Sequence, residues 1–413
     1  MRKISKEDRV RHITYTARLL CVLAVWLCST YAVVCRSQPV TEPVVTAYFD
    51  SVEVSLLTCS PHEEIYSLYG HTALRVHDLH AGNERDMVFN WGQFDFNTPH
   101  FITRFIFGLT DYKLGMEKIE PFCEYYRYWG SSVTEQVLNL TLAEKERLYQ
   151  ILNENLQPEN VTYRYNIFYN NCSTRPRDVI AQCLAGQIKY DTRQDYKPSF
   201  RDMLHEKTRY HRWVMFGTDM LLGLRADLQT TLKEQQFMPD NLLYDFDHAQ
   251  ILSNSDNSLR PLVSQRRQLV PSSVQIIEQD FPLTPTECAL CLLVVTMGLT
   301  LGEWKRRWKA VCYWDAALML LTGLAGCVLT MMLFSQHPTT TLNLQVLLVN
   351  PIHLFYIPAT LRHRKSHYPA MLAVMLVLLA IGALIQHYAE GLLILALCLL
   401  IRLVARIVMK KEK

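Results

Sequence analysis

The chain has 413 residues, of which 49% are hydrophobic and 20% are charged, and its formal net charge at pH 7 is +3. This length allows more than one folded unit, and so small a net charge gives no support for nucleic-acid binding. The hydrophobic residues are unevenly distributed and the basic residues cluster beside apolar runs. We therefore expect a membrane protein with a separate folded domain.

Residues 1–37 are predicted to be a basic cytoplasmic segment followed by a signal-anchor or a signal peptide. Met1–Arg18 is rich in Lys and Arg, Leu19–Val34 is apolar, and small or polar residues follow. In either case the basic flank stays in the cytoplasm and the following residues are exported. The sequence leaves open whether the apolar run is cleaved.

Residues 40–281 have ordinary charge and no apolar run long enough to cross a bilayer, so they are predicted to form a folded domain outside the cytoplasm. Thr141–Leu156 predicts a helix that begins with a capping box of Thr141 and Glu144. Strands and helices do not alternate strictly, which is typical of an α+β fold. Strands are predicted at 51–58, 71–76, 86–92, 132–140 and 163–169, with a helical turn at 63–69, a turn at 81–83 and a mixed segment at 104–116.

Residues 286–408 are predicted to form a transmembrane domain, followed by a cytoplasmic tail at 409–413. Each of five apolar spans approaches the roughly 20 residues that cross a bilayer. The connections after the first and third spans are basic, like the tail, whereas those after the second and fourth carry no Lys or Arg. The positive-inside rule therefore places both termini in the cytoplasm and residues 40–281 outside it. The spans are 286–302, 310–334, 342–361, 369–387 and 391–408.

Two features of these spans resemble functional motifs. Asn350-Pro351-Ile352-His353 interrupts the third span, and we favour a helix kink satisfied by neighbours over a segment that lines a cavity. Cys288 and Cys291 form a CxxC without partner ligands, so they are interpreted as packing residues.

The most informative motif is YRYNIFYNNCSTRPRD at residues 163–178. Ser173 or Thr174 can cap a helix, and Pro176 suits its first turn. Cys172 would then lie at a helix N-terminus, where the helix dipole lowers the pKa of a thiol. Such a cysteine is a candidate nucleophile, whereas an isolated cysteine is more often buried or disulfide-bonded.

His71 is the candidate base for this nucleophile. It follows Gly70 and begins a predicted strand, a rigid position for a base that must meet a thiol closely. Asn90 on the next predicted strand would orient the imidazole as the third member of a triad. A structural histidine is at least as common, and no Cys or carboxylate set completes a metal site with His71 and His77. We predict Cys172, His71 and Asn90 as catalytic residues, with no metal and no cofactor.

Four segments of the folded domain resemble the Lnb N-terminal periplasmic domain, and the spans from residue 286 onward resemble its companion transmembrane domain. The resemblance implies an apolipoprotein N-acyltransferase of the cytoplasmic (inner) membrane of a Gram-negative cell. It also implies an α+β catalytic domain similar to permuted papain-like (NlpC/P60-like) thiol hydrolases, in which histidine precedes cysteine, followed by an α-helical transmembrane bundle. Residues 186–280 hold no motif that carries over. The segments are SLLTCSPHEEIYSLYGHTALRV (55–76), VFNWGQFDF (88–96), YWGSSVTEQVLNLT (128–141) and YRYNIFYNNCSTRPRDVI (163–180).

The resemblance implies that Cys172 takes an acyl chain from a membrane phospholipid as a thioester. The chain would pass to the α-amine of a diacylated lipoprotein, with His71 moving the protons. The Cys172 backbone N–H and the Asn171 side chain would hold the oxyanion. Arg175 and Arg177 would meet a lipid phosphate or form salt bridges within the domain. Tyr165 would line an acyl path or pack in the core.

Two other functions remain open. The first is a membrane-tethered cysteine peptidase or amidase acting on peptidoglycan, although such a substrate does not require five membrane spans. The second is a non-catalytic envelope scaffold in which Cys59 or Cys183 forms a disulfide with Cys172. Cys59 lies in a motif nearly as distinctive as that of Cys172, so it is the alternative nucleophile.

Overall fold

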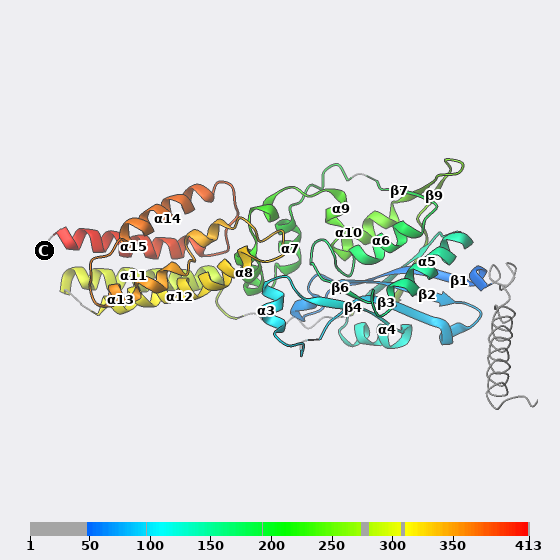
Figure 1. Ribbon diagram of the computed structural model, residues 1–413, viewed down its shortest axis with the longest axis horizontal. Helices are drawn as coiled ribbons and strands as arrows, with labels where there is room; N and C mark the ends of the chain where they lie inside the picture. Colours follow the sequence, from blue (N-terminus) through cyan, green and yellow to red (C-terminus); the bar gives the residue numbers. More distant parts are fainter. Residues whose placement is uncertain (1–47, 96, 192, 274–280, 307–309, 412–413) are drawn as a thin grey trace, which may run out of the picture. The chain divides into compact units, whose positions relative to one another are not determined.

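The computed structural model describes residues 48–95, 97–191, 193–273, 281–306 and 310–411. The chain divides into two units, of which the first ends at Ser51 and the second spans Val52–Lys413. The expected basic segment and signal sequence at 1–37 lie outside the described residues. Every element discussed below belongs to the second unit (Figure 1).

A seven-stranded antiparallel sheet forms the centre of residues 52–270, with the strand order β10-β5-β1-β2-β3-β4-β6. The strands predicted at 51–58, 71–76, 86–92 and 132–140 are confirmed as β1, β2, β3 and β5. The mixed segment at 104–116 contains a short helix and the start of β4. The strands are β1 (Val52–Cys59), β2 (His71–Asp78), β3 (Asp86–Gln93), β4 (Asp111–Lys118), β5 (Val133–Leu138), β6 (Thr162–Arg164) and β10 (Val263–Val270).

Helices cover both faces of this sheet, which explains why β1 and β5 are buried along almost their whole length. Helix α4 (Ile119–Tyr128) packs against β3, β4 and β10, and α6 (Thr174–Cys183) and α10 (Pro239–Asp247) pack against β2 and β1. Figure 1 shows α4 on one side of the sheet and α6 with α10 on the other. Helix α5 (Leu142–Asn155) begins with the predicted capping box of Thr141 and Glu144.

A buried ion network ties three strands of the sheet together. The Arg75 guanidinium on β2 donates to Asp86 Oδ1 and Oδ2 at 2.7 and 2.5 Å and to Glu135 Oε1 at 2.6 Å. Asp86 is 2% exposed and Glu135 is fully buried. Each carboxylate needs the arginine, because an unpaired charge in the interior costs several kcal/mol.

The predicted strand at 163–169 is wrong beyond Arg164. Asn166 and Asn170 form an isolated antiparallel bridge, with hydrogen bonds of 3.0 and 2.9 Å that close a tight turn. The Asn166 side-chain oxygen also accepts from the backbone N–H groups of Phe168 and Tyr169 at 3.1 and 3.2 Å. Local side-chain hydrogen bonds therefore compete successfully with the sheet ladder.

Residues 186–261 supply elements that no sequence motif indicated. A second, three-stranded antiparallel sheet has the order β7-β8-β9. The helices between β7 and β8 bury an apolar cluster that includes Phe200, Leu204 and Phe237. The elements are β7 (Gly186–Lys189), α7 (Phe200–Thr208), α8 (Arg212–Leu221), η3 (Leu224–Asp227), α9 (Leu232–Gln235), β8 (Gln250–Ser253) and β9 (Leu259–Pro261).

The C-terminal region is a bundle of apolar helices. Four segments are long and apolar enough to cross a membrane, and these are 285–305, 311–333, 344–361 and 392–409. The fourth predicted span is the shorter helix α14 of 15 residues. It ends at Gly382, and Gln386 in the connection beyond it donates to the carbonyl of Leu222 and to Asn343 Oδ1. The helices are α11 (Pro285–Arg306), α12 (Val311–Leu333), η4 (Leu344–Leu347), α13 (Ile352–Leu361), α14 (Tyr368–Gly382) and α15 (Leu392–Lys411).

The break at Asn350-Pro351 is satisfied by neighbouring groups, as expected. Asn350 Oδ1 accepts from the backbone N–H of Ile352 at 3.0 Å. The fully buried ring of His353 lies 2.9 Å from Tyr368 Oη and 2.8 Å from the Leu348 carbonyl oxygen. Both ring nitrogens are thus occupied by protein groups, which supports a structural role for this histidine.

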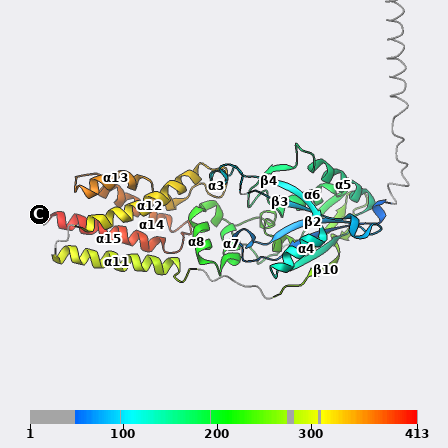
Figure 2. The ribbon, with the colours of Figure 1, turned by 90° about the horizontal axis from the view of Figure 1, so that it is seen from below.

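An ion pair and hydrogen bonds join α8 and the residues that follow it to one end of the bundle, which lies beside α8 in Figure 2. Arg212 on α8 forms an ion pair of 2.7 Å with Glu390. Asn343 Nδ2 donates to the Met220 carbonyl at 2.8 Å, and the Gly223 N–H donates to the Thr339 carbonyl at 2.8 Å. The connections 335–343 and 383–391 of the bundle therefore form the surface that contacts the sheet-containing part of the chain.

Candidate active site

Cys172 lies in the turn immediately before α6, whose N-cap residue is Ser173, and the side chain of the neighbouring Asn171 caps that helix. Asn171 Oδ1 accepts from the backbone N–H groups of Ser173 and Thr174, each at 2.9 Å. The expected cap by the Ser173 or Thr174 hydroxyl is wrong, since neither caps the helix in this way. Placement of the thiol at a helix N-terminus is confirmed, and Cys172 is partly exposed.

Asn171 is structural rather than a free donor for an oxyanion. Its side chain is 4% exposed, and Nδ2 donates to the carbonyls of Ile167 and Phe237 at 2.8 and 2.9 Å. Because both amide hydrogens are occupied, the expected oxyanion role of this side chain is wrong. The backbone N–H of Cys172 has no hydrogen-bond partner among the described residues, so it remains the donor that an oxyanion can use.

A tight turn fixes the position of His71. Gly70 has a φ of +77°, and a Cβ atom there would lie 2.8 Å from the carbonyl oxygen of Cys59. Only glycine fits this approach. The chain then enters β2 at His71, which is paired in the sheet register with Cys59 on β1.

His71 and Asn90 meet across the β2–β3 hairpin. His71 Nε2 lies 2.8 Å from Asn90 Oδ1, and Asn90 Nδ2 donates to Glu117 Oε1 on β4 at 3.4 Å. The carboxylate of Glu117 orients the amide, so Asn90 offers its oxygen to an N–H on Nε2. This leaves Nδ1 as the imidazole nitrogen that can exchange a proton with a thiol.

The three predicted catalytic residues converge at Gly92. A Cβ atom on this glycine would lie 3.2 Å from His71 Cε1, 3.6 Å from Asn90 Oδ1 and 3.9 Å from Cys172 Cβ. The structure thus brings Cys172, His71 and Asn90 together around one open position on β3. The sequence analysis did not single out Gly92. Its place two residues after Asn90 on β3 puts both residues on the same face of the strand, which was the available signal.

Electrostatics at the site favour an ion pair. Burial raises the pKa of the Cys172 thiol, but the charge of His71 and hydrogen bonds from His71, Thr72 and Ser173 outweigh it and bring the pKa below its usual value. Burial lowers the pKa of His71, but Cys172, Asn90 and Glu117 together raise it above its usual value. Both directions favour a thiolate beside an imidazolium, which is the reactive form of a catalytic cysteine.

Cys59 lies in a different environment. It is fully buried in the apolar cluster beneath α4, and burial raises the pKa of its thiol well above the usual value despite a hydrogen bond with Tyr126. A buried thiol with a raised pKa is a poor nucleophile. Cys59, Cys123, Cys172 and Cys183 are all free thiols in the structure.

The two arginines of α6 differ sharply. Arg177 is 5% exposed, forms an ion pair of 2.8 Å with Asp178 and donates to the Lys233 carbonyl at 2.8 Å. These contacts favour the salt-bridge alternative for Arg177 over phosphate binding. The Arg175 guanidinium lies 4.3 Å from the centroid of the Tyr163 ring. Within the described part of the chain Arg175 has no carboxylate in an ion pair, and its buried Nε has no hydrogen-bond partner.

Tyr165 stacks on a second tyrosine beside Cys172. The rings of Tyr165 and Tyr112 are 4.0 Å apart at 15°. Burial, followed by the charge of Cys172, raises the pKa of Tyr165 well above its usual value and that of Tyr112 to about 12. The role of Tyr165 in lining an acyl path stays a prediction. Tyr112 lay in a segment of mixed pattern and was not singled out from the sequence.

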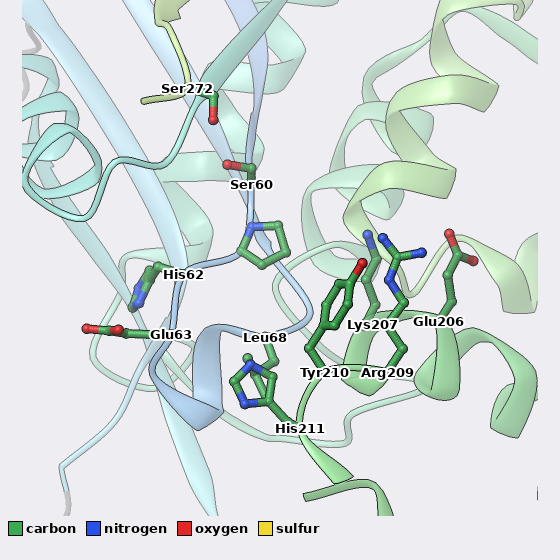
Figure 3. Close-up of a pocket in the computed structure, with 11 residues that line it drawn as sticks. Ser60, His62, Glu63, Leu68, Glu206, Lys207, Arg209, Tyr210, His211 and Ser272 are labelled. Atoms are coloured by element: carbon green, nitrogen blue, oxygen red, sulfur yellow. The ribbon is translucent and has the colours of Figure 1, made fainter. Parts of the chain in front are cut away.

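A cavity of about 380 Å³ is separate from the candidate active site. Cys172, His71 and Asn90 do not line it. Figure 3 shows Lys207, Arg209 and Glu206 on one side of it and His62 with Glu63 on the other. His62 stacks on Trp129 with ring centroids 4.7 Å apart, and burial lowers its pKa to about 4. The lining residues are Ser60, Pro61, His62, Glu63, Leu68, Glu206, Lys207, Arg209, Tyr210, His211 and Ser272.

One cluster has side chains of the types that bind metals. Ligand atoms of His205, Asp219 and His387 all lie within 4.8 Å of one another. Arg201 Nη1 already donates to Asp219 Oδ1 at 2.6 Å, which places a fixed cation where a metal ion would compete. His205 Nε2 lies 2.8 Å from the same oxygen, so the cluster is explained as an ion-pair network.

Comparison with known families matches both parts of the chain. Residues 45–205 match the Lnb N-terminal periplasmic domain, and residues 276–413 match the Lnb transmembrane domain. No curated protein and no solved structure matches the chain, so the expected likeness to papain-like hydrolases stays a prediction. The chain is a membrane protein of the Lnb family, with a periplasmic domain that carries the candidate site and a C-terminal transmembrane domain.

Proposed function

We propose that this protein is a cysteine-dependent N-acyltransferase of the cytoplasmic membrane. It takes an acyl chain from a membrane phospholipid and transfers it to the α-amine of a diacylglyceryl-cysteine lipoprotein. The observation that carries the proposal is the convergence of Cys172, His71 and Asn90, with the pKa of the thiol lowered and that of the imidazole raised. Membership of the Lnb family supports this choice of substrates.

In the first half-reaction the Cys172 thiolate attacks an ester carbonyl carbon of the phospholipid. A C–S bond forms as the carbonyl opens, and the resulting oxyanion accepts a hydrogen bond from the Cys172 backbone N–H. When the oxyanion collapses, the C–O bond to glycerol breaks and the leaving alkoxide takes the proton from His71. A lysophospholipid departs, and the acyl chain remains on Cys172 as a thioester.

In the second half-reaction the neutral α-amine of the lipoprotein attacks the thioester carbonyl. His71, now neutral, accepts the amine proton, and Asn90 holds its ring by the 2.8 Å contact at Nε2. Collapse of the oxyanion breaks the C–S bond and releases an N-acyl amide. The cycle ends with Cys172 as a thiolate and His71 protonated, so no cofactor is needed.

Two features favour acyl transfer over hydrolysis of a peptide in the cell wall. Both proposed substrates are anchored in a membrane, and the domain is hydrogen-bonded to the end of a bundle of membrane-spanning length. Arg175 also lies near the site without an ion-pair partner in the described chain, which suits the phosphate of a phospholipid. A soluble wall substrate requires neither feature.

Mass spectrometry of lipoprotein N-termini tests the proposal. The purified protein, phospholipid and a diacylglyceryl-cysteine peptide are incubated together, and Cys172→Ala is the paired variant. We expect an N-acylated, triacylated peptide only with the unmodified chain. Cleavage of peptidoglycan fragments without any triacylated peptide would support the peptidase instead, and no reaction with either substrate would support a scaffold.

A further inference from the structure

Helix α3 (Phe101–Ile106) presents apolar side chains to the outside of the molecule. Its sequence is FITRFI, and Ile102 is 74% exposed while Phe105 is 44% exposed. None of its six residues is buried. Burying an isoleucine or phenylalanine is favourable by about 1.5–3 kcal/mol, so such exposure indicates a surface that another apolar phase covers.

Hydrogen bonds hold α3 against the connection that follows α12. The Gln336 N–H donates to the Phe107 carbonyl at 2.9 Å, and His337 Nε2 lies 2.9 Å from the Phe105 carbonyl oxygen. On the other side, Arg104 forms an ion pair of 2.7 Å with Asp111 at the start of β4. These contacts therefore fix helix α3 at the junction of the sheet and the bundle.

The position of this connection sets the depth of α3. Helix α12 has 23 residues and is thus about 35 Å long, slightly more than the roughly 30 Å of hydrocarbon. Its C-terminal end is predicted to face away from the cytoplasm, because the basic connection lies at its other end. Residues 335–341 then lie at the outer surface of the membrane. Phe334, which is 78% exposed, and Leu342, which is 62% exposed, add apolar surface at the same level.

A row of aromatic rings leads from α3 to the candidate site. Successive ring centroids are 6.5, 6.0, 4.9 and 4.0 Å apart, and each pair is stacked at 15° to 26°. The row ends at Tyr165, seven residues before Cys172, where burial followed by the charge of Cys172 raises the pKa of the tyrosine. All five rings are partly or well exposed, so the row is a surface and not a closed core. In order, the rings belong to Phe105, Phe101, Phe94, Tyr112 and Tyr165.

We propose that α3 lies in the outer surface of the cytoplasmic membrane and that the ring row guides the acyl chain of a membrane phospholipid from there to Cys172. The location of α3 stands on the contacts with Gln336 and His337 and on its exposed apolar residues. The route along the rings rests in addition on the proposed acyl transfer. Flat apolar rings suit this task because they bind methylene groups without fixing one position of the chain.

Photocrosslinking tests the location of α3. The full chain is reconstituted in vesicles that contain an alkyne-tagged glycerophospholipid, with photoreactive benzoylphenylalanine in place of Ile102. The matched control replaces Leu79, which is 54% exposed and follows β2 at the end opposite His71, about 25 Å away along the strand. We expect lipid labelling at 102 at least about fivefold above that at 79. Equal labelling, or none at 102, would overturn the location.

A comparison of two donors tests the route. In Ile102→Asp, formation of the Cys172 acyl adduct from bilayer phospholipid should fall about tenfold or more, and adduct formation from a monomeric short-chain phospholipid should change less than twofold. Leu79→Asp should change neither rate. An equal fall with both donors, or no fall with vesicles, would overturn the route. If the unmodified chain forms no adduct with either donor, the proposed acyl transfer fails instead, while the crosslink still decides where α3 lies.

Discussion

His71 Nε2 lies 2.8 Å from Asn90 Oδ1, across the hairpin that joins β2 to β3. This contact fixes which imidazole nitrogen remains for Cys172, and Glu117 fixes the amide in turn. The base is thus positioned by neighbouring strands of one sheet, whereas the nucleophile lies just before the N-terminus of α6, 101 residues later in the chain (172 − 71). Rigid mounting of both groups is what a thiolate–imidazolium pair requires.

Replacing one cysteine at a time by serine tests which thiol is the nucleophile. Cys172→Ser should lower the acyl-transfer rate about a thousandfold or more, because a hydroxyl is a much weaker nucleophile than a thiolate at neutral pH. Cys59→Ser should retain most of the activity and lower stability, since it puts a hydroxyl into an apolar cluster. Rates are measured by production of triacylated peptide. Full activity in Cys172→Ser together with loss in Cys59→Ser would reverse the assignment.

The pH dependence of thioester formation follows from the two shifted pKa values. Cys172 becomes a thiolate at a lower pH than a free thiol, so the rate should rise on the acid side through its lowered pKa. His71 keeps its proton to a higher pH than a free imidazole, so the rate should fall on the alkaline side through its raised pKa. A bell-shaped profile is expected between these limits.

Asn90→Ala tests the same ion pair. The contact with Asn90 raises the pKa of His71, so its loss should move the alkaline limb to lower pH and reduce the rate about ten- to hundredfold. Asn153→Ala, on the exposed side of α5, is the control and should leave the profile unchanged. An unchanged alkaline limb in Asn90→Ala would show that Asn90 does not orient the base.

The two arginines of α6 should respond differently to the same substitution. Arg175→Gln should raise the KM for phospholipid about tenfold and leave the melting temperature nearly unchanged, because a charged hydrogen bond to phosphate is lost. Arg177→Gln should destabilise the fold by about 2 kcal/mol, since it loses contacts with Asp178 and the Lys233 carbonyl. Steady-state kinetics and thermal unfolding separate the two effects. A KM effect confined to Arg177→Gln would contradict the assignment.

Asn171→Ala should destabilise the domain by about 2–3 kcal/mol. It removes the cap of two N–H groups and leaves the carbonyls of Ile167 and Phe237 without their donors. Asn170→Ala is the matched control, because that side chain makes one hydrogen bond, to the Arg164 carbonyl. Thermal unfolding of both variants gives the comparison. An equal loss of stability in the two variants would show that the Asn171 cap contributes no more than the single hydrogen bond of Asn170.

Some parts of the site could be predicted from local sequence, and others depend on distant contacts. A helix after Cys172 and a hairpin joining His71 to Asn90 leave patterns within a few residues. The role of Asn171 as the cap leaves no such local pattern, because its amide donates to the carbonyl of Phe237, which is 66 residues away. Tyr112 joins the site only when β4 pairs with β3 and β6. The helices of 186–247 bury an apolar cluster together with Phe168, a contact between distant parts of the chain that no local pattern reveals.

The thioester on Cys172 is the most direct test of the proposed function. The purified protein is incubated with phospholipid alone, without an acceptor amine, and its peptides are analysed by mass spectrometry. We expect one acyl chain on the Cys172 peptide, released by neutral hydroxylamine and discharged to a triacylated product when a diacylglyceryl-cysteine peptide is added. No adduct on the active protein, or an adduct that persists in Cys172→Ala, would contradict the proposed mechanism.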